Sequence, residues 1–252
     1  MKRLIYIIIL VLTACGVLQA ASPKRFEVRT VDFEEIRKTV RDSVDSDSYY
    51  PRLMAAYLRN DTTMLADTLP SGEIVPGRVM TIEDYRNLYY GYVFEEDYSP
   101  YRISTFSEKL EHLYDNKEFT REESVLIKEN ARDALADNLF ELRQMSFFVI
   151  ALRQIKKENL ASIWQFRLNH LIAAIMSSGQ GTKEHPWVVT SLEHEYNIIN
   201  FLGYVAVEHE VIDGHIDFMK VAKKDDKSPE GFYFDVSKIM EVTEQKFYMP
   251  NE

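Results

Sequence analysis

Apolar residues recur every three or four positions along most of the stretch from residue 31 to residue 180, with polar residues between them. This spacing is typical of helices that bury one face. Short joints between neighbouring stripes indicate antiparallel helical hairpins, loosely like tetratricopeptide units but without a repeat period. The pattern predicts helices over 31–44, 51–58, 81–92, 104–113, 120–135, 142–155 and 159–178.

From Pro186 onward the apolar runs become short, and some alternate with period two. Segments 204–212 and 215–222 flank Asp213-Gly214, a pair typical of a tight hairpin turn. Strands are also predicted at 187–190 and 232–234, and helices at 193–202 and 237–247. The predicted fold is therefore α+β. Helical hairpins over 31–180 precede a small antiparallel β-sheet with flanking helices over 186–252.

Segment 68–80 interrupts the helical pattern. It contains Pro70, Gly72, Pro76 and Gly77. Proline and glycine at this density are typical of turns, because proline lacks a backbone donor and glycine adopts conformations that other residues avoid. We therefore predict a surface loop there.

Composition limits the partners. The chain of 252 residues is 46% hydrophobic, which is enough for a substantial core, and its formal net charge is −10. An acidic surface repels phosphate backbones, and no basic stripe offsets that repulsion, so we expect no nucleic-acid partner. The single cysteine, Cys15, excludes an internal disulfide.

The N-terminus carries an export signal. Met1-Lys2-Arg3 is followed by the apolar run 4–12, which is of leader length. The sequence Leu12-Thr13-Ala14-Cys15 resembles a bacterial lipobox, in which the thiol receives a lipid. The alternative is an ordinary leader cut after Gly16 or near Ala20. Either route predicts a signal peptide and tether start over 1–21 and a periplasmic or outer-membrane-associated protein. A lipid anchor through Cys15 follows only from the first.

Two groups of side chains are candidate binding sites. A two-residue turn at Asp213-Gly214 would place four side chains on one sheet face, where a divalent cation would offset the repulsion between acids. The alternative is a solvated face with His209 in the opposite apolar layer. The four candidate ligands are Glu208, Glu210, His215 and Asp217.

The second group lies in a tyrosine-rich segment, where aromatic faces beside carboxylates suit a sugar-like ligand. Adjacent acids do not supply the separated pair that glycoside hydrolysis requires, and helical spacing alternatively predicts that most of these rings are core. The candidate surface comprises Tyr89, Tyr92, Glu95, Glu96 and Asp97.

Familiar catalytic motifs are missing from the sequence. His194 has Ile198 four residues later, where a zincin needs a second histidine. The glycine-rich stretch 178–183 follows a predicted helix and lacks the order of a phosphate-binding loop. No Gly-x-Ser-x-Gly is present.

Several ordered phrases together resemble one family. They are Tyr49-Tyr50-Pro51-Arg52-Leu53, Tyr85-Arg86-Asn87-Leu88-Tyr89-Tyr90-Gly91-Tyr92, Tyr98-Ser99-Pro100-Tyr101, Ser177-Ser178-Gly179-Gln180-Gly181, Glu195-Tyr196-Asn197-Ile198-Ile199 and Gly231-Phe232-Tyr233-Phe234-Asp235-Val236. From about Asp32 to Val242 the chain is similar to the domain of unknown function 4919 family of exported bacterial proteins. The resemblance implies an envelope location and a helical body with a small C-terminal sheet. It implies no activity, cofactor or catalytic residue.

These observations favour an exported, non-catalytic binding or interaction module whose ligand and cofactors the sequence does not name. The alternative is an envelope hydrolase acting on glycans or peptides, and a purely structural role is the third interpretation.

Overall fold

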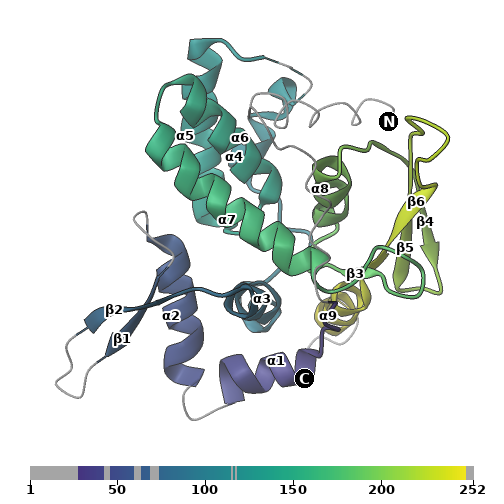
Figure 1. Cartoon of the computed structure of the whole chain (residues 1–252), viewed down its shortest axis with the longest axis horizontal. Coiled ribbons are helices and arrows are strands. Elements are labelled where there is room, and N and C mark those ends of the chain that lie inside the picture. Colours follow the sequence, from purple (N-terminus) through teal and green to yellow (C-terminus); the bar gives the residue numbers. More distant parts are fainter. Residues whose placement is uncertain are drawn as a thin grey trace.

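The structure, a computed structural model, describes residues 28–42, 46–59, 64–68, 74–114, 116 and 118–247. The predicted leader and Cys15 lie outside the described residues. Every helix in the part of the chain that the structure describes is too short or too polar to cross a lipid bilayer. Figure 1 shows helices at the centre, a small sheet on one side and a two-stranded hairpin on the other.

The N-terminal unit is a group of short helices with one hairpin. Asp32 caps the first helix by accepting hydrogen bonds from the backbone N–H groups of Glu34 and Glu35. Its helices are α1 (Phe33–Arg37), η1 (Lys38–Asp42), α2 (Ser46–Leu58), α3 (Ile82–Gly91) and η2 (Tyr92–Phe94), and its strands are β1 (Met64–Thr68) and β2 (Ile74–Val79).

The prediction of a loop over 68–80 was wrong for most of that segment, since β1 and β2 pair antiparallel there. Pro76 lies opposite Ala66 within the pair. In a two-stranded sheet both strands are edges, so a proline that cannot donate on its outer side is tolerated. Pro51 also lies inside α2 rather than at its start.

Helical hairpins form the body, as predicted. Capping boxes at Thr81 and Thr120 start α3 and α5, and Asn138 caps the end of α5. α5 packs on α6, α6 packs on α7, and α7 also contacts α3. The remaining helices are α4 (Thr105–Glu108), η3 (Glu111–Leu113), α5 (Arg121–Asp137), α6 (Leu142–Gln154) and α7 (Glu158–Met176).

Tyrosine rings supply much of the core around α3. Tyr85, Tyr89 and Tyr90 are fully buried, and Gly91 lets the ring of Tyr50 approach the helix backbone. Several of the tyrosine hydroxyls donate hydrogen bonds to internal carbonyls. Tyr50 donates to the Leu88 carbonyl at 3.1 Å, for example. Such hydrogen bonds fix the orientation of each buried ring in addition to the apolar contacts that the ring makes.

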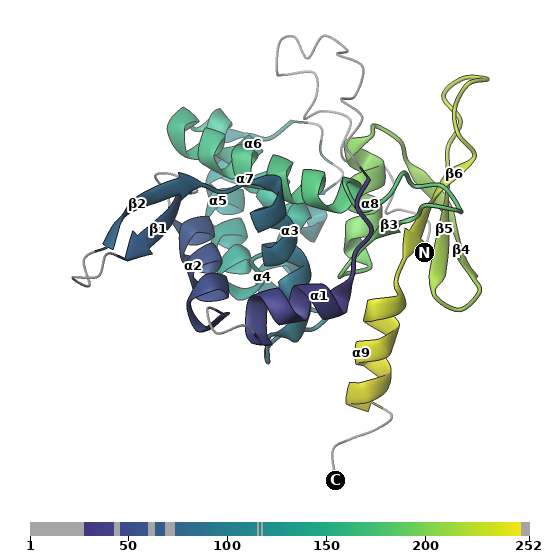
Figure 2. The ribbon, with the colours of Figure 1, turned by 60° about the horizontal axis from the view of Figure 1, so that its bottom comes forward.

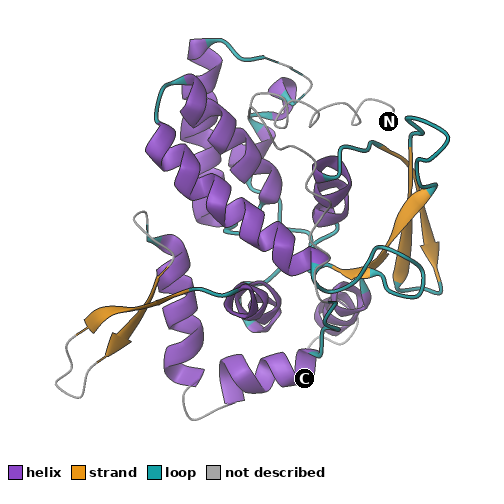
Figure 3. Ribbon diagram, in the orientation of Figure 1, coloured by secondary structure: helices purple, strands orange, loops and turns teal. Residues whose placement is uncertain are grey.

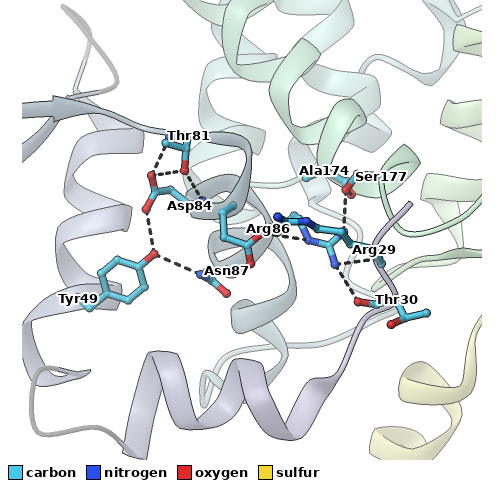
Figure 4. A network of polar contacts seen from close by, with 10 residues as sticks. Arg29, Thr30, Tyr49, Thr81, Asp84, Arg86, Asn87, Ala174 and Ser177 are labelled. Carbon is cyan, nitrogen blue, oxygen red and sulfur yellow. Dashed lines mark hydrogen bonds and ion pairs between the residues drawn. The ribbon is translucent and has the colours of Figure 1, made fainter. Parts of the chain in front are cut away.

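A polar clamp joins the segment before α1 to α3 and α7 (Figure 4). The Arg86 guanidinium donates to the carbonyls of Arg29 and Thr30 at 3.0 and 3.1 Å and to Ser177 Oγ at 2.7 Å. Burial opposes ionisation of Asp84, but hydrogen bonds from Arg78, Thr81 and Tyr49 lower its pKa to about 2. The side chains of Arg86 and Asp84 therefore both hold neighbouring elements together.

The C-terminal unit is a four-stranded sheet with the order β3-β6-β5-β4 (Figures 1 and 3). The pairs β4–β5 and β5–β6 are antiparallel, as predicted, but β3 pairs parallel to β6, so the sheet is mixed. Figure 2 shows α9 extending from the end of β6. The elements are β3 (Trp187–Val188), α8 (Glu193–Phe201), β4 (Ala206–Ile212), β5 (Ile216–Val221), β6 (Gly231–Asp235) and α9 (Ser237–Phe247).

The β4–β5 hairpin closes one residue later than the sequence suggested. Ile212 pairs with Ile216, so the loop comprises Asp213, Gly214 and His215. Asp213 and Gly214 adopt positive φ angles of 56° and 76°. The carbonyl of His215 accepts a hydrogen bond from the Val236 N–H at 2.9 Å, which attaches the loop to the segment after β6. One added loop residue changes which strand residues face each other, and therefore changes the candidate site.

Candidate metal centre

The register separates the four predicted ligands. Glu208 lies opposite Lys220 and Glu210 opposite Phe218, on one face of the hairpin. Asp217 lies opposite Val211 on the other face. His215 is in the turn, where its Nδ1 is 2.9 Å from the Asp213 carbonyl oxygen. The prediction that these four side chains share a face was therefore wrong, because it assumed a two-residue turn.

Asp217 instead meets two residues that were not among the predicted ligands. His209 on β4 is on the same face, and its Nε2 lies 2.9 Å from Asp217 Oδ2. Glu195 comes from α8, the helix beside the sheet. One donor atom from each of these three side chains lies within 4.8 Å of the other two. Three elements therefore bring two carboxylates and one imidazole to a single point.

The two carboxylates are buried and incompletely hydrogen-bonded. Glu195 is 1% exposed and Asp217 2%. Within the described residues, Glu195 Oε1 and Asp217 Oδ1 are fully buried and have no hydrogen-bond partner. Burial, together with the nearby Asp217 carboxylate, raises the pKa of Glu195 to about 9. An unpartnered buried oxygen costs about 1–3 kcal/mol, and more when it is charged. A hydrogen bond between the Glu195 and Asp217 side chains also contributes to this raised pKa, and His209 contacts Asp217 Oδ2, so Glu195 Oε1 and Asp217 Oδ1 are the two cluster oxygens left without a described partner.

The donor set suits a divalent transition metal. Imidazole nitrogen is a ligand for Zn²⁺ and its neighbours in the periodic table, and carboxylate oxygen joins it in many zinc sites. Tetrahedral zinc bonds of about 2.0–2.2 Å place the donor atoms about 3.4 Å apart, so binding would require small shifts of these side chains, including a slight opening of the 2.9 Å His209–Asp217 contact. The His209 side chain is 40% exposed, so one of the three candidate ligands lies at the surface. Three protein donors also leave a coordination position for water.

A sequence signal for Glu195 existed but was not used. Glu195, Ile198 and Ile199 follow the i, i+3, i+4 spacing of one helix face. All three are buried. A carboxylate in an apolar stripe is expected to be buried and therefore to need a partner. The position of Glu195 on the predicted helix thus indicated a candidate site residue.

His194, the residue before Glu195, has a structural role in the core. Its Nδ1 is 2.6 Å from the Tyr89 hydroxyl, and its Nε2 is 2.9 Å from the Phe140 carbonyl oxygen. Since a carbonyl only accepts, Nε2 carries the proton and Nδ1 accepts from Tyr89. Burial lowers the pKa of His194 to about 4, so the ring is neutral.

The predicted ligand surface divides between core and solvent. Tyr89 is fully buried and Tyr92 is 9% exposed. Glu96 and Asp97 are exposed and Glu95 is half-buried. Asp97 accepts from the Tyr92 hydroxyl at 3.1 Å and pairs with Arg102 at 3.2 Å. The aromatic faces are therefore used in packing, and the acids lie in a surface turn beside them.

One more acid is buried, at the start of α6. Glu141 is 3% exposed and accepts a hydrogen bond from Ser107 Oγ at 2.5 Å through its Oε1. Burial raises its pKa to about 7. Its Oε2 and Gln144 Oε1 are both buried and without a hydrogen-bond partner among the described residues. Burial outweighs the hydrogen bonds from Ser107 and Gln144, which lower the pKa, and so favours the protonated carboxyl over a wider pH range than usual.

A family model for the domain of unknown function 4919 matches residues 77–245. The chain belongs to this family. The match begins later than Asp32, where the sequence phrases suggested the resemblance would start. No curated protein and no solved structure matches the chain.

In this DUF4919 protein all three residues of the cluster lie within the family segment, as do α3 to α8 and the four-stranded sheet. The segments α1, α2 and β1 precede it. Membership brings no activity with it, because the family is one of unknown function. The functional argument therefore rests on the chemistry of the cluster.

Proposed function

We propose that this DUF4919 chain is an exported, non-catalytic envelope protein that binds one divalent transition-metal ion, of the Zn²⁺ class. Glu195, His209 and Asp217 are the proposed ligands. The observation that carries the proposal is the pair of buried carboxylates, each with an oxygen that has no partner in the described structure, beside an imidazole nitrogen. A cation supplies the charge and the bonds that these atoms lack.

The arrangement favours binding over hydrolysis. A glycan hydrolase needs two carboxyl groups about 5–10 Å apart across a bound sugar. Glu95 and Asp97 lie in one surface turn, and each faces an arginine, Arg41 at 3.6 Å and Arg102 at 3.2 Å. The metal would instead link α8 to the β4–β5 hairpin. Such a link would fix the position of the hairpin relative to the helix, which is a structural role.

Titration of the purified protein with ZnCl₂ tests the proposal. We expect one site per chain by calorimetry, and we expect Asp217→Asn to weaken it at least tenfold because an amide replaces a charged ligand. Glu195→Gln is expected to weaken zinc binding to the same degree while raising the stability of the metal-free protein by about 1–3 kcal/mol, since it removes one of two buried acids. A loss of binding with a gain in stability cannot come from unfolding.

Glu210→Gln and His215→Ala are the matched controls, because both lie on the same hairpin but away from the cluster. Both should bind zinc as the parent protein does. The proposal is wrong if the parent shows no binding at millimolar zinc, or if the control variants lose as much affinity as Asp217→Asn.

A further inference from the structure

β4 is the outer strand of the four-stranded sheet, and its far side pairs with no other described strand. In an antiparallel edge strand, alternate N–H and C=O groups point away from the neighbouring strand. A bulge at Ala206/Glu208 disrupts the start of β4, whereas the ladder from Glu208 to Ile212 is regular. A regular stretch with free backbone groups is a template for one more strand.

Both faces of this stretch are accessible. Residues 207–211 are all exposed, and Val211 is 55% exposed. His209 and Val211 lie on the face that carries Asp217 and the core residue Met219. On this face the exposed apolar side chain of Val211 lies at the edge of the sheet, beside the His209–Asp217 pair. Tyr196 of α8, at 39% exposure, is another uncovered apolar side chain beside the cluster on this face.

The other face of the edge is acidic. Glu208 pairs with Lys220 at 3.0 Å, whereas Glu210 lies opposite Phe218 and has no ion-pair partner in the described part of the chain. Two copies of β4 paired antiparallel, with their sheet faces aligned and centred on His209, would place Glu208 opposite Glu210. Centred on Glu210, they would place that carboxylate opposite its own copy. Like charges directly opposite destabilise a pair of strands, so self-association through this edge is disfavoured.

We propose that the edge Glu208–Ile212 binds an extended basic segment of a partner protein, which adds to the sheet beside β4. The segment carries Lys or Arg at positions facing Glu208 and Glu210 and apolar residues at positions facing His209 and Val211. Backbone hydrogen bonds supply affinity, and the alternation of charge and apolar surface selects the sequence and its register. The net charge of −10 also attracts a basic partner over a distance.

The test uses two capped, fluorescently labelled octapeptides, one alternating Lys with Val and the other alternating Glu with Val. We expect the intact protein to bind the Lys–Val peptide at least tenfold more tightly by fluorescence anisotropy. Glu210→Lys should remove that preference. Glu129→Lys makes the same charge change on the exposed surface of α5 and should leave the preference in place. Glu210 is on the face opposite His209 and Asp217, so the variant spares the proposed metal ligands.

A third peptide separates strand addition from attraction between charges. Methylation of alternate backbone nitrogens in the Lys–Val peptide removes donors but keeps its charge, and we expect binding to fall at least tenfold. Equal binding of the methylated peptide, or equal loss in the Glu129→Lys protein, would show only non-specific attraction and overturn the proposal. A concentration-dependent dimer that Glu210→Lys alters would overturn it in favour of a second copy.

Discussion

At the residue scale, the buried acids are the features that call for chemistry. Glu195 and Asp217 share one small volume, and Glu141 occupies another. In both places an oxygen is removed from water without a described partner. The first group has an imidazole next to it and suits a metal, whereas the second has Ser107 and Gln144 next to it and suits a proton.

Glu141→Gln tests the proton at the second site. The raised pKa means that the folded state holds the proton more tightly than the unfolded chain, so its stabilising effect is present below about pH 4.5 and disappears as pH rises to about 7. A neutral amide avoids this loss and can donate to Gln144 Oε1. We expect the variant to gain about 3 kcal/mol relative to the parent between pH 4.5 and pH 8, measured by urea unfolding at both pH values. A difference that does not change with pH would contradict the assignment.

At the scale of elements, local signals define the helices well. The capping box at Thr120 is complete, since Thr120 Oγ1 accepts from the Glu123 N–H at 3.1 Å and Glu123 Oε2 accepts from the Thr120 N–H at 2.7 Å. Such a box depends only on residues three apart, so it is visible in the sequence. The β4–β5 register depends instead on the length of the loop, whose residue His215 accepts a hydrogen bond from Val236, far away in the sequence.

Thr120→Ala should therefore lower the free energy of unfolding by about 1 kcal/mol, or about 2–4 °C in Tm, because the first turn of α5 loses its cap. Thr105→Ala is the control, since Thr105 is exposed at the start of α4, after the cap residue Ser104. Thermal unfolding followed by circular dichroism should show less than half the effect for the control. Equal shifts would mean that the box contributes nothing specific.

At the scale of the whole molecule, one core joins the N-terminal helices, the hairpin body and the sheet. Buried residues from α1 to α9 belong to a single cluster, and Tyr90 and Tyr98 of the α3 region donate hydrogen bonds to the Val188 and Thr190 carbonyls at 3.2 and 2.7 Å. The boundary drawn in the sequence between 31–180 and 186–252 therefore coincides with a change of secondary structure but not with a separation of cores.

Export is a prediction from the N-terminal sequence, and it is tested with the full chain in bacterial cells. We expect the protein to fractionate with membranes, to incorporate labelled palmitate, and to lose both properties as Cys15→Ser, because the lipid would be attached to that thiol. Soluble periplasmic protein with no label in the parent would favour the ordinary leader. Protein in the cytosol that retains Met1 would contradict export.

The amino-acid sequence by itself determined most of the helices, the capping boxes at Thr81 and Thr120 and the β4–β5 hairpin, because those features depend on residues within a few positions of each other. It also carried the family phrases. It did not show the β1–β2 pair. It did not show that β3 pairs parallel to β6, or that Glu195 reaches His209 and Asp217. The first contact pairs two strands that are separated in the chain by α8, β4 and β5, and the second joins α8 to strands that follow it. A one-residue change in turn length decides which side chains of the hairpin face the helix. Only the tertiary structure places two acids and one imidazole at the same point.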